Sequence, residues 1–210
     1  MIIDSLALGA YETNCYVLRS SEEVKDCLIV DAGLGANKLI EFLQENQLNP
    51  VSVVLTHGHI DHIEGVASLR ADFPDIKVYI HKLDAEMLTE PYTNLSAMTG
   101  VPFSIEPADF LLEDQSVIEE AGIKLTALHT PGHTPGGICL YCEDEGVVFT
   151  DDTLFADSIG RTDFPNGNTK QLLQSIREKL FILPDETKVY SGHGPSTSIA
   201  HEKNYNPFLR

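Results

Sequence analysis

The chain has 210 residues, of which 42 % are hydrophobic, and carries a formal net charge of −18 at pH 7. This length and composition predict a globular protein with a sizeable core, and we expect one domain over residues 1–210. So acidic a surface repels phosphate groups, which argues against nucleic-acid and membrane partners. No apolar run approaches the roughly 18 residues of a membrane helix, and no signal peptide is visible, so a cytoplasmic location is expected.

The first half of the chain alternates strand and helix patterns. Apolar runs predict strands at 13–18, 26–31, 51–55 and 77–80. Helical periodicity predicts a helix over 36–46, another that ends at 72–74, and a short one over 83–88. Residues 91–107 have little periodicity, which predicts a long loop. This loop could either lie over an active site or simply connect the two halves.

The second half repeats this alternation. Strands are predicted at 123–128, 137–142, 146–150 and 188–190. A helix is expected to begin near Asn168 and Thr169, because both residues are good N-caps. No linker separates the halves, which supports the expectation of a single domain.

Four metal-binding side chains follow strand 51–55, namely His57, His59, Asp61 and His62. In extended backbone the side chains at i, i+2 and i+4 point the same way, which suits the first three for convergence. His62 requires a bend near Asp61, such as a helix start. Imidazole nitrogens and carboxylate oxygens favour zinc, iron or manganese. The alternative to a metal site is that residues 57–62 form a solvated polar loop.

Three further candidates each follow a predicted strand and lie beside glycine or proline: His133, Asp152 and His193. Strand ends on one sheet edge are close in space. The resulting seven ligands are too many for one four-coordinate zinc and suit two metals that share a carboxylate. We expect one metal on His57, His59 and His133, and the other on Asp61, His62 and His193. Asp152 would bridge the two.

Other polar residues allow more than one role or are expected outside the metal site. Asp31, at the end of strand 26–31, could orient a ligand histidine or merely form a turn. His129 is expected behind the ligands or in packing, and His81 and His201 on the surface. The four cysteines are predicted to be buried thiols, although Cys139 and Cys142 form a C-x-x-C pair.

These motifs resemble the metallo-β-lactamase superfamily. The likeness rests on H-x-H-x-D-H at 57–62, T-P-G-H-T at 130–134, the strand-end Asp152 and G-H-G at 192–194. It implies an α/β fold, the four-layer αββα sandwich, with two divalent metal ions at one edge of the sheets. Zinc is the expected metal, with iron or manganese as alternatives.

Within the superfamily the chain is similar to short bacterial glyoxalase II. The similarity rests on residues 13–16, 150–155 and 158–164. It implies hydrolysis of a thioester such as S-lactoylglutathione, a small-molecule partner, by a metal-bridging hydroxide. Asp61 would hold that hydroxide as a catalytic residue, and Arg161 would bind a substrate carboxylate or form a surface ion pair.

The sequence departs from this family at two places. The family usually has glycine at the position of Asp151, so this extra carboxylate could alter the metal preference. Full-length glyoxalase II has a C-terminal helical region that supplies cations for glutathione. Here residues 194–210 contain only Lys203 and Arg210 as fixed cations, which predicts a truncated glutathione site.

Two alternatives remain open at this stage. A persulfide dioxygenase of the same superfamily also carries a G-R-T-D-F segment and would hold one iron with His57, His133 and Asp152. The other alternative is a metal-binding protein without catalysis. The oligomeric state is not indicated by the sequence.

Overall fold

The computed structural model describes residues 1–210, which form two compact units. One unit contains residues 1–112 and 118–124, and the other contains residues 113–117 and 125–210. The single domain expected from the sequence stays a prediction. No helix combines the length and apolar composition needed to cross a membrane.

The first unit is built on a six-stranded sheet with the order β1-β2-β3-β4-β5-β6. Its strands are β1 (Ile2–Leu8), β2 (Thr13–Arg19), β3 (Asp26–Val30), β4 (Asn49–Val54), β5 (Lys77–His81) and β6 (Phe110–Leu112). The pairs from β3 to β6 are parallel, whereas β1, β2 and β3 pair in antiparallel fashion. The carboxyl ends of β3, β4 and β5 therefore lie at one edge of this sheet.

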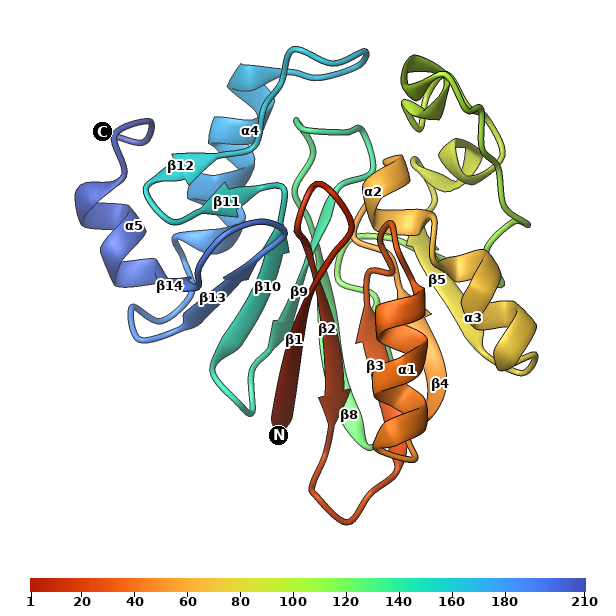
Figure 1. Cartoon of the computed structure of the whole chain (residues 1–210). Coiled ribbons are helices and arrows are strands. Elements are labelled where there is room, and N and C mark those ends of the chain that lie inside the picture. Colours follow the sequence, from red (N-terminus) through yellow and green to blue (C-terminus); the bar gives the residue numbers. More distant parts are fainter. The chain divides into compact units, whose positions relative to one another are not determined.

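Helices α1 (Asn37–Glu45) and α3 (Val66–Asp72) share one apolar core with this sheet (Figure 1). Leu39 and Leu43 of α1 and Leu69 of α3 are fully buried in it, which is the amphipathic pattern expected of surface helices. The short helix α2 (Ile60–Ile63) precedes α3, and the 3₁₀ turns η1 (Ala85–Leu88) and η2 (Ser96–Thr99) follow β5.

The second sheet has the order β14-β13-β10-β9-β8-β7. Its strands are β7 (Val117–Glu120), β8 (Ile123–His129), β9 (Ile138–Cys142), β10 (Val147–Asp151), β13 (Lys188–Ser191) and β14 (Thr197–Ser198), and β11 (Leu154–Phe155) and β12 (Ser158–Ile159) form a separate hairpin. Strands β8 and β10 are both antiparallel to β9, and β13 is parallel to β10. The carboxyl ends of β8, β10 and β13 thus lie at one edge of this sheet.

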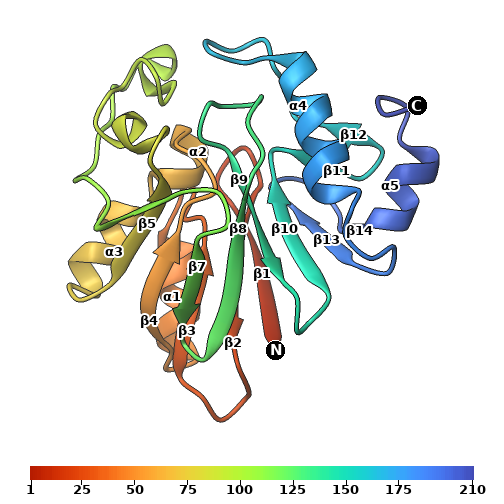
Figure 2. The ribbon, with the colours of Figure 1, turned by 180° about the vertical axis from the view of Figure 1, so that it is seen from behind.

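Helices α4 (Thr169–Ser175) and α5 (Ile199–Tyr205) belong to the core of the second unit (Figure 2). Asn168 caps α4, since its Oδ1 accepts a hydrogen bond from the backbone N–H of Gln171 at 3.1 Å. This confirms the predicted helix start. A π-helical turn, η3 (Ile176–Leu180), continues α4 and buries Ile176 and Leu180.

Several elements were not predicted, and one local expectation was wrong. Strand β1 was not predicted, and neither were the short strands β6, β7, β11, β12 and β14 nor helix α5. The loop over 91–107 contains the turn η2. His81 was expected on the surface, but it is the last residue of β5 and is 2 % exposed. Its Nδ1 accepts a hydrogen bond from the Leu83 N–H at 3.3 Å, so the ring closes the turn after the strand.

Candidate functional site

The H-x-H-x-D-H segment lies at the carboxyl end of β4 and turns into α2. His59 is extended, with φ −72° and ψ 150°, and α2 begins at the next residue, as the expected bend requires. His57 Nε2 lies 3.0 Å from His59 Nδ1, and the ring centroids of His57 and His62 are 4.3 Å apart. All three imidazoles are buried. They form a compact group of nitrogen donors.

Asp61 is the more accessible member of this segment, with its side chain 19 % exposed. Its Oδ2 lies 3.3 Å from His62 Nε2 and accepts a hydrogen bond from the Thr13 hydroxyl at 3.3 Å. The hydroxyl holds the carboxylate from the start of β2. Asp61 can therefore offer an oxygen to a metal or a water molecule without leaving its hydrogen bond.

Asp31 lies behind the histidines. Its Oδ2 is 3.2 Å from His62 Nδ1 and accepts a hydrogen bond from the Thr56 hydroxyl at 2.8 Å. Its Oδ1 accepts a hydrogen bond from the Thr56 backbone N–H at 2.8 Å. A carboxylate in this position favours the tautomer with hydrogen on Nδ1, which leaves Nε2 of His62 available to a metal.

A close backbone approach brings Asp31 to α2. The Ala32 N–H donates to the carbonyl of His62 at 2.9 Å. A Cβ added to Gly33 would lie 2.3 Å from the backbone carbonyl oxygen of Asp61, so only glycine fits there. The sequence predicted a helix over 36–46 but not the close contact between Gly33 and the backbone of Asp61.

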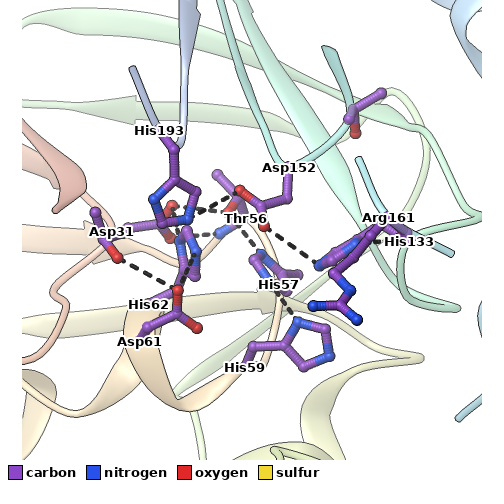
Figure 3. Close-up of polar contacts among 12 residues, drawn as sticks. Asp31, Thr56, His57, His59, Asp61, His62, His133, Asp152, Arg161 and His193 are labelled. Atoms are coloured by element: carbon purple, nitrogen blue, oxygen red, sulfur yellow. Dashed lines mark hydrogen bonds and ion pairs between the residues drawn. The ribbon is translucent and has the colours of Figure 1, made fainter. Parts of the chain in front are cut away.

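The second unit holds the other three candidate ligands. Asp152 follows β10, and Figure 3 shows its carboxylate between the rings of His133 and His193. Oδ2 lies 3.5 Å from His133 Nε2, and Oδ1 lies 3.5 Å from His193 Nε2. One carboxylate thus presents a different oxygen to each of two imidazoles, an arrangement in which each oxygen could serve a different metal ion.

His133 is oriented by the backbone of a neighbouring segment. Its Nδ1 donates a hydrogen bond to the carbonyl oxygen of Arg161 at 2.7 Å, which leaves Nε2 facing Asp152. The backbone near this site is also tight, because a Cβ on Gly160 would overlap the carbonyl oxygen of Asp152. These contacts fix the ring and the carboxylate in relation to each other.

The side chain of Arg161 forms an exposed ion pair. Nε and Nη2 donate to the two carboxylate oxygens of Asp163 at 2.7 and 2.8 Å, and the guanidinium lies 4.0 Å from the centre of the Phe164 ring. This pairing lowers the pKa of Asp163 to about 2 and raises the pKa of Arg161. The surface ion pair considered for Arg161 is therefore present.

The other titratable groups fit mainly structural roles. All four cysteines are free and buried, as expected. Burial raises the pKa of Cys27 and that of Cys139 to about 12, so both thiols stay neutral at physiological pH. His129 ends β8, and its Nε2 lies 2.9 Å from the carbonyl oxygen of Pro135. His201 lies on α5 with its side chain 42 % exposed, near the carboxylate of Asp157.

The predicted site residues therefore fall into two groups. The first unit brings together His57, His59, Asp61, His62 and Asp31, and the second brings together His133, Asp152, His193 and Arg161. A shared dinuclear centre stays a prediction. Sequence reasoning missed Thr13 and Thr56, since a hydroxyl beside a distant carboxylate leaves no pattern in one sequence.

Comparisons with known proteins add family information. A family model described as "Metallo-beta-lactamase superfamily" matches residues 8–193. The chain is 39 % identical to "Probable metallo-hydrolase YqgX" of Bacillus subtilis, over 97 % of this chain and 95 % of the relative. It is 35 % identical to "Hydroxyacylglutathione hydrolase GloC" of Haemophilus influenzae, over 100 % of this chain and 98 % of the relative.

Solved structures agree with this family match. BLEG-1, a B3 metallo-beta-lactamase, is 41 % identical with a TM-score of 0.94, over 99 % of both chains. TTHA1623, solved in a di-iron-bound form, is 33 % identical with a TM-score of 0.86 over 100 % of both. ETHE1 from Myxococcus xanthus is 30 % identical with a TM-score of 0.80, over 99 % of this chain and 84 % of that one. The predicted α/β class and four-layer αββα sandwich are confirmed.

Proposed function

This chain belongs to the metallo-β-lactamase superfamily, and from that premise we propose that it is a dinuclear metal-dependent hydrolase that cleaves thioesters. The names of its relatives support a metal-dependent hydrolase in general. The finer proposal is a glyoxalase II-type thioesterase that acts on S-lactoylglutathione or a related small thioester. The observation that carries it is Asp152, which presents one oxygen to His133 and the other to His193.

The donor set fits two divalent cations. It comprises five imidazoles and two carboxylates, and nitrogen and oxygen donors of this kind suit zinc, iron or manganese. The proposed ligands of one ion are His57, His59 and His133, and those of the other are Asp61, His62 and His193, with Asp152 as the bridge. Such ions supply a water molecule of lowered pKa and polarise the substrate carbonyl.

The residues of the chain have three tasks in this proposal. Asp61 accepts a hydrogen bond from the attacking water while Thr13 Oγ1 holds the carboxylate in place. Asp31 and the Arg161 carbonyl fix the tautomers of His62 and His133. The leaving thiolate needs little help from an acid, since thiols ionise with a pKa near ~8.5.

Arg161 is proposed to bind a carboxylate of the substrate. Its guanidinium is supported by the Phe164 ring, and the Arg161 side chain is 59 % exposed, so a carboxylate from solution can reach it. Asp163 occupies the guanidinium in a two-point contact, the geometry that a substrate carboxylate would also use. A substrate carboxylate would therefore compete with Asp163.

The partners and the cellular location of the protein are also proposed here. We expect a small-molecule substrate and neither a nucleic-acid nor a membrane partner, given the net charge of −18. A cytoplasmic location is supported by four buried free thiols, which suit a reducing compartment.

A second candidate is a persulfide dioxygenase with one iron held by His57, His133 and Asp152. The similarity to ETHE1 gives it some weight. This reaction consumes oxygen, whereas thioester hydrolysis does not. The similarity to BLEG-1 also makes β-lactam hydrolysis a reaction to measure.

The test is a comparison of three substrates on the purified protein loaded with zinc, manganese or iron. S-lactoylglutathione is followed by thioester absorbance, a chromogenic β-lactam by ring opening, and glutathione persulfide by oxygen uptake. We expect turnover of the thioester, with the other two slower by at least about tenfold. Faster oxygen uptake would favour the dioxygenase, and no turnover of any substrate would favour a metal-binding protein without catalysis.

A further inference from the structure

Two consecutive aspartates lie at the end of strand β10, where Asp151 is its last residue and Asp152 follows it. Asp152 is the proposed bridging ligand, and Asp151 precedes it. Asp151 is only 5 % exposed and has a φ of +43°, a left-handed conformation that side chains other than glycine, asparagine and aspartate rarely adopt. It pairs with Ser191 of β13 at a register shift in the ladder. This strand end therefore holds a buried carboxylate where a glycine would fit the backbone more easily.

One carboxylate oxygen of Asp151 and one of Asp152 lie beside Gly192. A Cβ built on Gly192 would lie 2.3 Å from Asp151 Oδ1 and 2.5 Å from Asp152 Oδ1. Since both oxygens lie within 2.5 Å of this one point, they are close neighbours. Both face the turn that carries His193, whose Nε2 is 3.5 Å from Asp152 Oδ1. The side chain of Asp151 thus reaches the same ligand group.

Two adjacent carboxylates that are largely shielded from water repel each other. A cation between or beside them relieves this repulsion. The guanidinium of Arg161 is already paired with both oxygens of Asp163. A divalent ion held by Asp152 and the two histidines would place positive charge beside this pair.

We propose that Asp151 is an additional oxygen ligand of the metal centre and shifts its preference from zinc towards manganese or ferrous iron. The proposal rests on the metal centre of the proposed function. Carboxylate oxygens suit manganese, whereas imidazoles suit zinc, and structural zinc sites are usually complete with four ligands. One more carboxylate therefore favours an ion that accepts a larger coordination number.

The test compares wild type with Asp151→Gly and Asp151→Asn. Glycine takes the left-handed conformation without cost, and asparagine tolerates it, so both variants are expected to fold. Asparagine keeps the shape of the side chain but removes its charge. Asp144→Asn is the control, because Asp144 is an exposed carboxylate in the turn between β9 and β10 and loses the same charge.

The readouts are the Kd values for Mn²⁺ and Zn²⁺, measured by chelator competition on metal-depleted protein, and the EPR spectrum of bound Mn²⁺. Both variants should bind Mn²⁺ at least about tenfold more weakly and lose less Zn²⁺ affinity, while Asp144→Asn should bind both metals as wild type does. Loss of a carboxylate ligand should also change the EPR spectrum.

An unchanged ratio of Mn²⁺ to Zn²⁺ affinity in both variants would overturn this assignment. The assignment would also be overturned if Asp151→Asn bound both metals as wild type does and only Asp151→Gly bound them more weakly. In that case a neutral amide would replace the carboxylate without loss of metal affinity. If wild type itself binds neither metal, the proposed function fails as well. If wild type, Asp151→Gly and Asp151→Asn all bind metal and hydrolyse the thioester equally well, Asp151 is not a ligand, whereas the proposed function stands.

Discussion

The carboxylate of Asp31 lies 3.2 Å from Nδ1 of His62, and the two side chains are 2 % and 0 % exposed. The same carboxylate accepts hydrogen bonds from the N–H and the hydroxyl of Thr56. Asp31 thus connects the ends of β3 and β4 to α2. A buried carboxylate behind an imidazole fixes its tautomer and raises its basicity towards a metal.

Asp31→Asn is therefore expected to weaken metal binding by about 10- to 100-fold. Losses of this size are typical when a residue that hydrogen-bonds to a metal ligand is replaced. Asparagine tolerates the left-handed φ of +57°, so the fold should persist. Chelator competition measures the change. Asp26→Asn is the matched control, because Asp26 is exposed at the start of the same strand. Equal metal affinity in all three proteins would show that Asp31 only forms the turn.

Gly192→Ala should displace both carboxylates at the end of β10. The new Cβ would meet Asp151 Oδ1 at 2.3 Å and Asp152 Oδ1 at 2.5 Å, closer than carbon and oxygen can approach. We expect metal content per chain to fall by at least half in elemental analysis. Gly194→Ala is the control, since nothing lies within 4 Å of its Cβ and its cost is backbone strain alone. Full metal content in Gly192→Ala would contradict this placement of the carboxylates.

Arg161→Gln should raise KM for S-lactoylglutathione by about tenfold, because one charge-assisted contact to a substrate carboxylate is lost. KM for an acyl thioester without a carboxylate should stay within about twofold of wild type. Arg177→Gln, an exposed arginine on η3, serves as control. A similar rise with both substrates would mean that Arg161 acts through its structural pairing with Asp163 instead.

The buried thiols should make stability fall in alkaline solution. Cys27 and Cys139 have folded-state pKa values of about 12, whereas an unfolded thiol ionises near ~8.5. Above pH ~8.5 the unfolded chain has released these protons and the folded chain has kept them, so the free energy of unfolding decreases with rising pH. The slope is at most about 1.4 kcal/mol per pH unit for each thiol.

Urea unfolding between pH 7 and 10 measures this slope. The double variant Cys27→Ala and Cys139→Ala is less stable at every pH because it loses buried contacts, but its slope should be shallower. A slope identical to that of wild type would show that the two thiols do not contribute to the alkaline loss of stability.

The ligand-bearing strands could be predicted because each combines an apolar run with a polar residue directly after it. Strands 51–55 and 146–150 are continuous apolar runs, and the structure has β4 at Asn49–Val54 and β10 at Val147–Asp151. Strand β1 was missed because its residues are mostly half-buried and show no clear alternation. Strands β6 and β14 have three and two residues, and pairing with a neighbour rather than local sequence defines them.

The residues around the ligands were harder to predict than the ligands. Asp31 contacts Thr56 and His62, which lie 25 and 31 positions away, and Thr13 contacts Asp61 from 48 positions away. No periodicity encodes such pairs in one sequence. His81 was misjudged for a similar reason, since a polar residue at a strand end is buried only when the following turn covers it.

The most direct test of the central claim is elemental analysis combined with S-lactoylglutathione turnover, on wild type and Asp152→Ala. A paired-metal hydrolase predicts close to two divalent ions per wild-type chain and measurable turnover. Asp152→Ala should then lose at least one metal equivalent and most of the thioesterase activity. Unchanged metal content and turnover in Asp152→Ala would contradict the account.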